Sequence, residues 1–139
     1  MKEQNYLDCL VGVFGHPVAE NPGVVIQEAA FRALGLDRWR FLTIDVKPED
    51  IADAIRGLKA MNMRGINCTI PHKIAVIKHL DKIAPSARLI GAVNTIINDD
   101  SDLSFNVGRW LISQIFFPTA LDLLKLRPTS AFKFIGSHA

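Results

Sequence analysis

Residues 65–73 carry the sequence GINCTIPHK. The first six of these residues are mostly apolar or β-branched, which is typical of a strand, and Pro71 suits the first position of a helix. Alternation along the strand places Asn67 and Thr69 on the same side, which is unusual for a strand that apolar residues cover on both faces. The stretch therefore predicts a strand that ends in polar groups and is followed at once by a helix.

The same order of strand and helix recurs on both sides of this stretch. Short apolar or β-branched runs predict further strands, and proline and glycine mark the starts and stops of the helices between them. The predicted strands are 10–14, 39–46, 65–70 and 93–97, with 103–105 pairing with the last of them, and the predicted helices lie within 22–34, 48–61, 71–80 and 84–90. We therefore expect an α/β fold: an open, mainly parallel three-layer α/β sheet domain.

Each of the first three predicted helices has an apolar stripe that we expect to face the sheet. The expected inward-facing residues are Val25, Ile26, Ala29, Ala30, Ala33 and Leu34, then Ile51, Ile55, Leu58 and Met61, and finally Ile74, Ile77 and Leu80. Asn21 precedes Pro22 at the start of the first helix, which predicts an N-cap. Gly35 is expected to end that helix.

The composition is that of an ordinary globular domain. The chain has 139 residues, of which 49% are apolar and 22% charged, and its net charge of +2 gives no reason to expect nucleic acid or a membrane as partner. No apolar run approaches the roughly 20 residues that span a bilayer, and the polar start does not resemble a secretory signal. Cys9 and Cys68 both lie in apolar stretches, which favours reduced thiols in a cytoplasmic protein.

The composition changes near residue 106. Residues 107–139 contain four basic, one acidic and five aromatic residues, whereas basic and acidic residues are nearly balanced before them. We therefore expect one domain over residues 6–106 and an atypical tail over residues 107–139. This tail is interpreted either as a C-terminal helix that packs on the sheet or as an aberrant, truncated segment.

Four polar residues are candidates for a site at the carboxyl ends of the strands, where open α/β sheets bind their ligands. Asn67 and Thr69 end one strand, and Asn94 begins another. Lys73 follows in the first helical turn, where the helix dipole disfavours the ammonium form, so that its amine can carry a proton to and from a substrate. The alternatives are a capped strand end with a solvated lysine and an asparagine that only pairs with backbone.

Several common sites are not indicated. The four histidines show no ligand spacing with cysteines or acidic residues, so we expect no metal site. No Gly-x-Gly-x-x-Gly follows a strand, and there is neither a P-loop nor a Gly-x-Ser-x-Gly elbow. We therefore expect no cofactor to bind this chain by itself.

Four segments in this order resemble one enzyme family: GHPVA at 15–19, EAAF at 28–31, the stretch 65–73, and GAVNTI at 91–96. Over about residues 11–98 the chain is similar to the N-terminal, substrate-binding domain of shikimate dehydrogenases and their quinate/shikimate relatives. The resemblance implies NADP-dependent, reversible oxidation of shikimate to 3-dehydroshikimate, a step toward chorismate and the aromatic amino acids. In that family the lysine matching Lys73 transfers the proton, and the positions of Asn67, Thr69 and Asn94 bind the substrate's hydroxyls.

The chain also departs from the family pattern. A Ser-x-Ser pair that binds the substrate carboxylate aligns with residues 21–23, which makes Asn21 a further candidate for substrate binding. The aspartate that partners the lysine is missing near Asn106, and so is the Rossmann NADP domain. Three interpretations follow: a substrate-binding domain that is not catalytically competent alone, a non-catalytic module that binds polyol acids, and a degenerate truncated product. The first implies a homo-oligomer or a separate chain that carries the cofactor domain.

Overall fold

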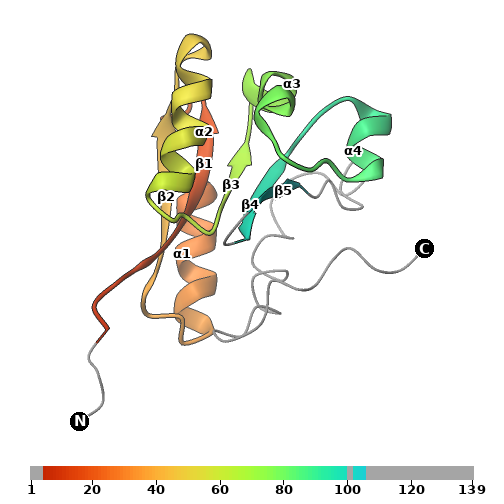
Figure 1. Ribbon diagram of the computed structural model, residues 1–139. Helices are drawn as coiled ribbons and strands as arrows, with labels where there is room; N and C mark the ends of the chain where they lie inside the picture. Colours follow the sequence, from red (N-terminus) through yellow and green to blue (C-terminus); the bar gives the residue numbers. More distant parts are fainter. Residues whose placement is uncertain (1–4, 100–101, 106–139) are drawn as a thin grey trace.

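The described part of the chain, residues 5–99 and 102–105, contains one five-stranded sheet (Figure 1). In this computed structural model the strands are β1 (Cys9–Gly15), β2 (Trp39–Asp45), β3 (Gly65–Cys68), β4 (Thr95–Asp99) and β5 (Asp102–Phe105). Their order across the sheet is β2-β1-β3-β4-β5, so the sheet is open, as predicted. The predicted tail, residues 107–139, lies outside the described residues, and the division of the chain at residue 106 stays a prediction.

The strand directions divide the sheet into two parts. β1 pairs in parallel with both β2 and β3, whereas β4 runs antiparallel to β3 and β5 runs antiparallel to β4. The α/β class is confirmed, and so is the predicted pairing of residues 103–105 with the preceding strand. The parallel pairs are confined to β2, β1 and β3, which makes the sheet mixed.

Helices cover both faces of the sheet. They are α1 (Gly23–Ala33), α2 (Ile51–Ala60), α3 (His72–Ala75) and α4 (Pro85–Ile90), with 3-10 turns η1 (Pro48–Asp50) and η2 (Val76–His79). α1 packs on one face through a cluster that includes Phe31 and Phe41, whereas α2, η2 and α4 share a larger cluster on the other face. Figure 1 shows α1 and α2 on opposite sides of β1 and β2. The three layers that the sequence predicts are therefore present.

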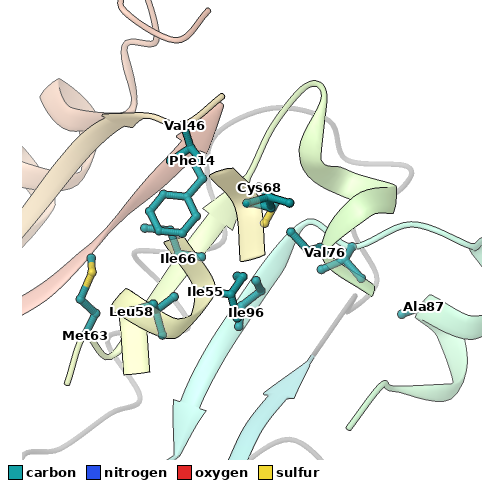
Figure 2. Packing of buried hydrophobic residues seen from close by; sticks show 12 residues of the cluster. Phe14, Val46, Ile55, Leu58, Met63, Ile66, Cys68, Val76, Ala87 and Ile96 are labelled. Atoms are coloured by element: carbon teal, nitrogen blue, oxygen red, sulfur yellow. The ribbon is translucent and has the colours of Figure 1, made fainter. Parts of the chain in front are cut away.

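The larger cluster forms the main core of the domain. Strand residues Phe14, Ile66 and Ile96 meet α2 residues Ile55 and Leu58 there, and all five side chains are almost completely inaccessible to water (Figure 2). Burial of each such side chain contributes about 1.5–3 kcal/mol of transfer free energy. This core holds the strand ends, on which the candidate site depends, in fixed relative positions.

The predicted buried face of α1 is wrong. Val25 is 68% exposed and Leu34 is also exposed, whereas the buried residues of this helix are Gln27 and Phe31. The helix contains apolar residues nearly all round, so the spacing of small and branched residues did not distinguish its faces. The large ring of Phe31, which also contacts Trp39, determines which face packs on the sheet.

The predicted stripes of the next two helices are correct only in part. Ile51, Ile55 and Leu58 are buried as expected, but Met61 is 58% exposed because α2 ends at Ala60, and the following turn buries Met63 instead. Ile74, predicted to face inward, is 70% exposed. His72 and Val76, four residues apart as on one face of an α-helix, are the buried pair, which turns Ile74 outward, whereas Ile77 and Leu80 are partly buried against the main core.

Candidate functional site

The candidate residues gather where β1, β2 and β3 end and β4 begins. The Thr69 N–H donates to the Phe14 carbonyl at 2.9 Å, which joins the ends of β1 and β3. The Cys68 N–H donates to the Asn94 carbonyl at 2.7 Å, because β4 is antiparallel and starts beside the end of β3. The backbone thus brings residues 67–69 and Asn94 to one edge of the sheet.

Asn67 and Thr69 are both half-buried at this edge. The Thr95 hydroxyl donates to Asn67 Oδ1 at 3.2 Å, so the first residue of β4 orients the Asn67 amide. Thr69 fits against Gly15, since a Cβ built on that glycine would lie 2.4 Å from Thr69 Cγ2. Sequence reasoning did not single out Thr95, although its place beside Asn94 at a strand start was a signal for it.

Lys73 lies on α3, half-buried, next to the same strand end. Its carbonyl accepts a hydrogen bond from the Val93 N–H at 2.6 Å, which ties it to the segment that leads into β4. Burial raises the pKa of the Cys68 thiol to about 12, and the nearby positive charge of Lys73 acts in the opposite direction. A helix of four residues has only a weak dipole, so that part of the sequence argument for Lys73 loses force.

His72 fixes the start of α3. It is fully buried, and its Nε2 lies 2.6 Å from the Val46 carbonyl, just after β2. Because a carbonyl only accepts, Nε2 carries the proton, and the buried Nδ1 has no hydrogen-bond partner among the described residues. His72 therefore connects the turn carrying Lys73 to the end of β2. Sequence reasoning quoted this histidine but assigned it no role.

Asn21 has a structural contact of its own. Its Oδ1 accepts the Gly23 N–H at 2.9 Å at the start of α1. The predicted N-cap is one residue too early, because α1 begins at Gly23 and Pro22 occupies the N-cap position without a side-chain cap. This contact is local to the start of α1. The assignment of Asn21 to substrate binding stays a prediction.

A hollow of about 200 Å³ lies elsewhere, between α2 and η2. Its lining residues are Ala52, Ile55, Arg56, Lys59, His79 and Asp81, and it includes none of the predicted site residues. Within the described ranges no three His, Cys, Asp or Glu side chains are grouped so as to hold a metal ion. Nor is any described helix long and apolar enough to cross a membrane.

Residues 13–96 match the family described as the shikimate dehydrogenase substrate binding domain. The chain belongs to this family. The resemblance inferred from the motifs at residues 15–19, 28–31, 65–73 and 91–96 is therefore confirmed.

Full-length relatives are much longer than this chain. It is 45% identical over 100 residues to the shikimate dehydrogenase (NADP(+)) of Dehalococcoides mccartyi strain CBDB1, covering 72% of this chain and 35% of the relative. The ligand-free 5-ketofructose reductase of Gluconobacter sp. strain CHM43 matches with a TM-score of 0.70 and 46% identity, over 73% of this chain and 36% of that one. For the shikimate 5-dehydrogenase of Listeria monocytogenes in complex with shikimate and NAD, the TM-score is 0.68 and the identity is 34%, and the match covers 76% of this chain and 37% of that one. The chain thus spans about a third of each relative.

Proposed function

We propose that this chain is the substrate-binding part of an NADP-dependent dehydrogenase that interconverts shikimate and 3-dehydroshikimate, with shikimate or quinate as its ligand class. The observation that supports the proposal best is the common edge shared by residues 67–69, Lys73 and Asn94. A polyol needs several fixed donors and acceptors, and amides and a threonine hydroxyl offer both. Two free cysteines, Cys9 and Cys68, support a reducing, cytoplasmic setting.

In this proposal Lys73 moves the proton. Oxidation of a secondary alcohol removes the hydroxyl proton as the hydride leaves the carbon, and the Lys73 amine accepts that proton. Asn67, Thr69 and Asn94 hold the neighbouring hydroxyls, so that the reacting oxygen stays near Lys73. NADP supplies the hydride acceptor when it is bound.

The described residues do not fit a dinucleotide. The loop after β1 leads into α1, but Asn21 already accepts the Gly23 N–H at the start of this helix, and the loop contains two prolines. A pyrophosphate is usually held by free N–H groups at such a helix start. We therefore assign the cofactor to other residues, on a further domain or on a separate chain, and derive no step through it.

Ligand titration tests the proposal. We expect shikimate or quinate to bind the purified chain in isothermal titration calorimetry, and the substitution Asn94→Ala to raise the Kd about fivefold, because one hydrogen bond is worth about 1 kcal/mol. Asn94 is exposed, so its removal leaves the core intact. The matched control is Lys59→Ala, which changes a lysine that pairs with Asp81 beside the hollow. Equal Kd values for the wild type and Asn94→Ala would contradict the proposed binding role.

The proposed lack of independent catalysis has its own assay. We expect no NADPH formation from shikimate and NADP by the purified chain, because the nicotinamide is not held near the substrate. Activity that disappears in Lys73→Ala would contradict this and would reveal a cofactor site on this chain. A binding module without catalysis would show ligand binding but no activity after a cofactor-domain chain is added.

A neutral keto sugar is the second candidate ligand. The loop that aligns with the carboxylate-binding serines offers an Asn21 amide oxygen that already accepts the Gly23 N–H, a proline without an N–H, and a glycine without a side chain. One relative at 46% identity is a 5-ketofructose reductase, whose named substrate has no carboxylate. Titration of the same chain with 5-ketofructose separates the candidates, since a smaller Kd than for shikimate would favour the neutral ligand.

A further inference from the structure

A histidine–aspartate pair occupies the same edge of the sheet as the candidate site. His16 Nδ1 lies 2.8 Å from Asp45 Oδ1. The two residues come from neighbouring strand ends, because Gly15 and Asp45 are register partners in β1 and β2. Their side chains are 39% and 60% exposed, so both remain accessible to a ligand.

The backbone places His16 beside the turn that carries Lys73. The His16 N–H donates to the Ile70 carbonyl at 3.0 Å, two residues beyond the last paired residues of β1 and β3, Phe14 and Cys68. Ile70 lies between Thr69 and Pro71, where β3 passes into α3. His16 is therefore adjacent, through its main chain, to the residues assigned to hydroxyl binding and proton transfer.

The aspartate determines which ring nitrogen is available. A carboxylate only accepts, so Nδ1 of His16 carries a proton, and the neutral form of the ring has its lone pair on Nε2. Nδ1 is turned toward β2, so Nε2 is turned away from that strand. Among the described residues, Nε2 has no further hydrogen bond. The pair thus presents an oriented acceptor at the edge, in addition to the amide of Asn94 and the amine of Lys73.

We propose that His16 is a further substrate-binding residue, which accepts a hydrogen bond from a hydroxyl of the polyol bound at this edge. Asp45 is a positioning residue that acts through His16 by selecting its tautomer and orientation. The inference rests on the proposed function, because it requires a polyol at this edge. The other two described histidines do not qualify, since His72 is fully buried and His79 lines the hollow beside α2.

Titration of four single variants with shikimate and quinate tests the inference. We expect His16→Ala to raise the Kd about three- to tenfold, the effect of one hydrogen bond. Asp45→Ala should raise it less, and Asp45→Asn should leave it near the wild-type value, because the amide oxygen still accepts from Nδ1. The matched control, His79→Ala, should not change the Kd. Unfolding curves of all variants check that the fold is retained.

A spectroscopic measurement separates a binding role from a structural one. In ¹⁵N-labelled protein, we expect the His16 Nε2 resonance to shift when ligand is added, while that of Nδ1 stays in the protonated range. An unchanged Nε2 resonance, together with equal Kd values for the wild type and His16→Ala, would overturn the inference while Asn94→Ala still weakened binding. Absence of binding by the wild type would overturn the proposed function, and the inference with it.

Discussion

Gly12 provides the sharpest test of the sheet, because it allows β1 to approach β2 closely. A Cβ built on Gly12 would lie 2.3 Å from the Leu42 carbonyl oxygen and 3.2 Å from Ile66 Cδ1. A carbon–oxygen contact needs about 3.3 Å, so Gly12→Ala forces a separation of roughly 1 Å. The obstructing atom belongs to the backbone, and no side-chain rotation relieves the clash.

The expected cost follows from two effects. Overpacking costs typically about 1–3 kcal/mol, and each weakened backbone hydrogen bond of the β1–β2 ladder adds about 1 kcal/mol. We therefore expect Gly12→Ala to lower the free energy of unfolding by about 2–4 kcal/mol, out of about 5–15 kcal/mol for a domain of this kind.

Gly57→Ala is the matched control for this substitution. Gly57 lies inside α2, and the nearest atom to an added Cβ there is Met61 Cε at 3.7 Å, an ordinary contact. Alanine favours a helix by about 1 kcal/mol over glycine, so this variant should be slightly stabilised. Urea unfolding followed by circular dichroism measures both variants. If the free energy of unfolding of Gly12→Ala lies within about 0.5 kcal/mol of the wild-type value, the inference that β1 and β2 approach closely at Gly12 is wrong.

Three further substitutions or treatments have clear expected outcomes. Native Cys68 should react with a thiol reagent at pH 8 far more slowly than half-exposed Cys9, because burial raises its pKa from 9.0 to about 12, and equal rates would contradict its burial. Met63→Ala should cost about 2–5 kcal/mol, since Met63 is completely buried in the main core, and a loss below 1 kcal/mol in urea unfolding would refute that placement. The pKa of His79 is lowered from 6.5, mainly by burial and to a lesser extent by nearby positive charges. Between that lowered pKa and 6.5, the folded state therefore binds fewer protons than the unfolded state. Stability should therefore fall as pH decreases through this window, and His79→Gln should reduce the slope; an identical slope would count against the lowered pKa.

Most elements of the fold could be predicted because their signals are local. Pro85 and Gly91 bound α4 as expected, and Gly35 and Gly91 take the positive φ that ends their helices. The direction of β4 could not be predicted from such signals. It depends on the path of residues 69–94, which return to the end of β3 before β4 begins, and no local pattern determines where that path ends.

Helix faces were less predictable than helix positions. A stripe of apolar residues indicates a face only when the rest of the helix is polar, and α1 does not meet this condition. α3 shows a second reason, because its buried face begins with a histidine, His72, whereas the prediction of Ile74 relied on apolar residues alone. In both cases one large buried side chain, Phe31 or His72, decides the packing.

The hydrogen bonds of the candidate site join residues that are far apart in the sequence. They are therefore harder to predict from the sequence than the positions of the single residues. Asn67, Thr69 and Lys73 could be placed at one edge because they lie at or just after the end of one strand. Asn94 reaches the same edge only because β4, whose direction could not be predicted, begins beside the end of β3. The His16–Asp45 and Asn67–Thr95 pairs join residues 29 and 28 positions apart, so they follow only once β1 is known to adjoin β2, and β3 to adjoin β4.

The contact of His72 crosses a larger part of the sheet, because the ring reaches past β1 to the Val46 carbonyl just after β2. The order of strands does not predict this contact, since it also requires that the His72 ring face inward at the start of α3. A shorter side chain at position 72 would leave the Val46 carbonyl without this donor and would release the turn that carries Lys73. The orientation of the proposed proton-transfer residue therefore depends on tertiary packing, whereas its location follows from the sequence.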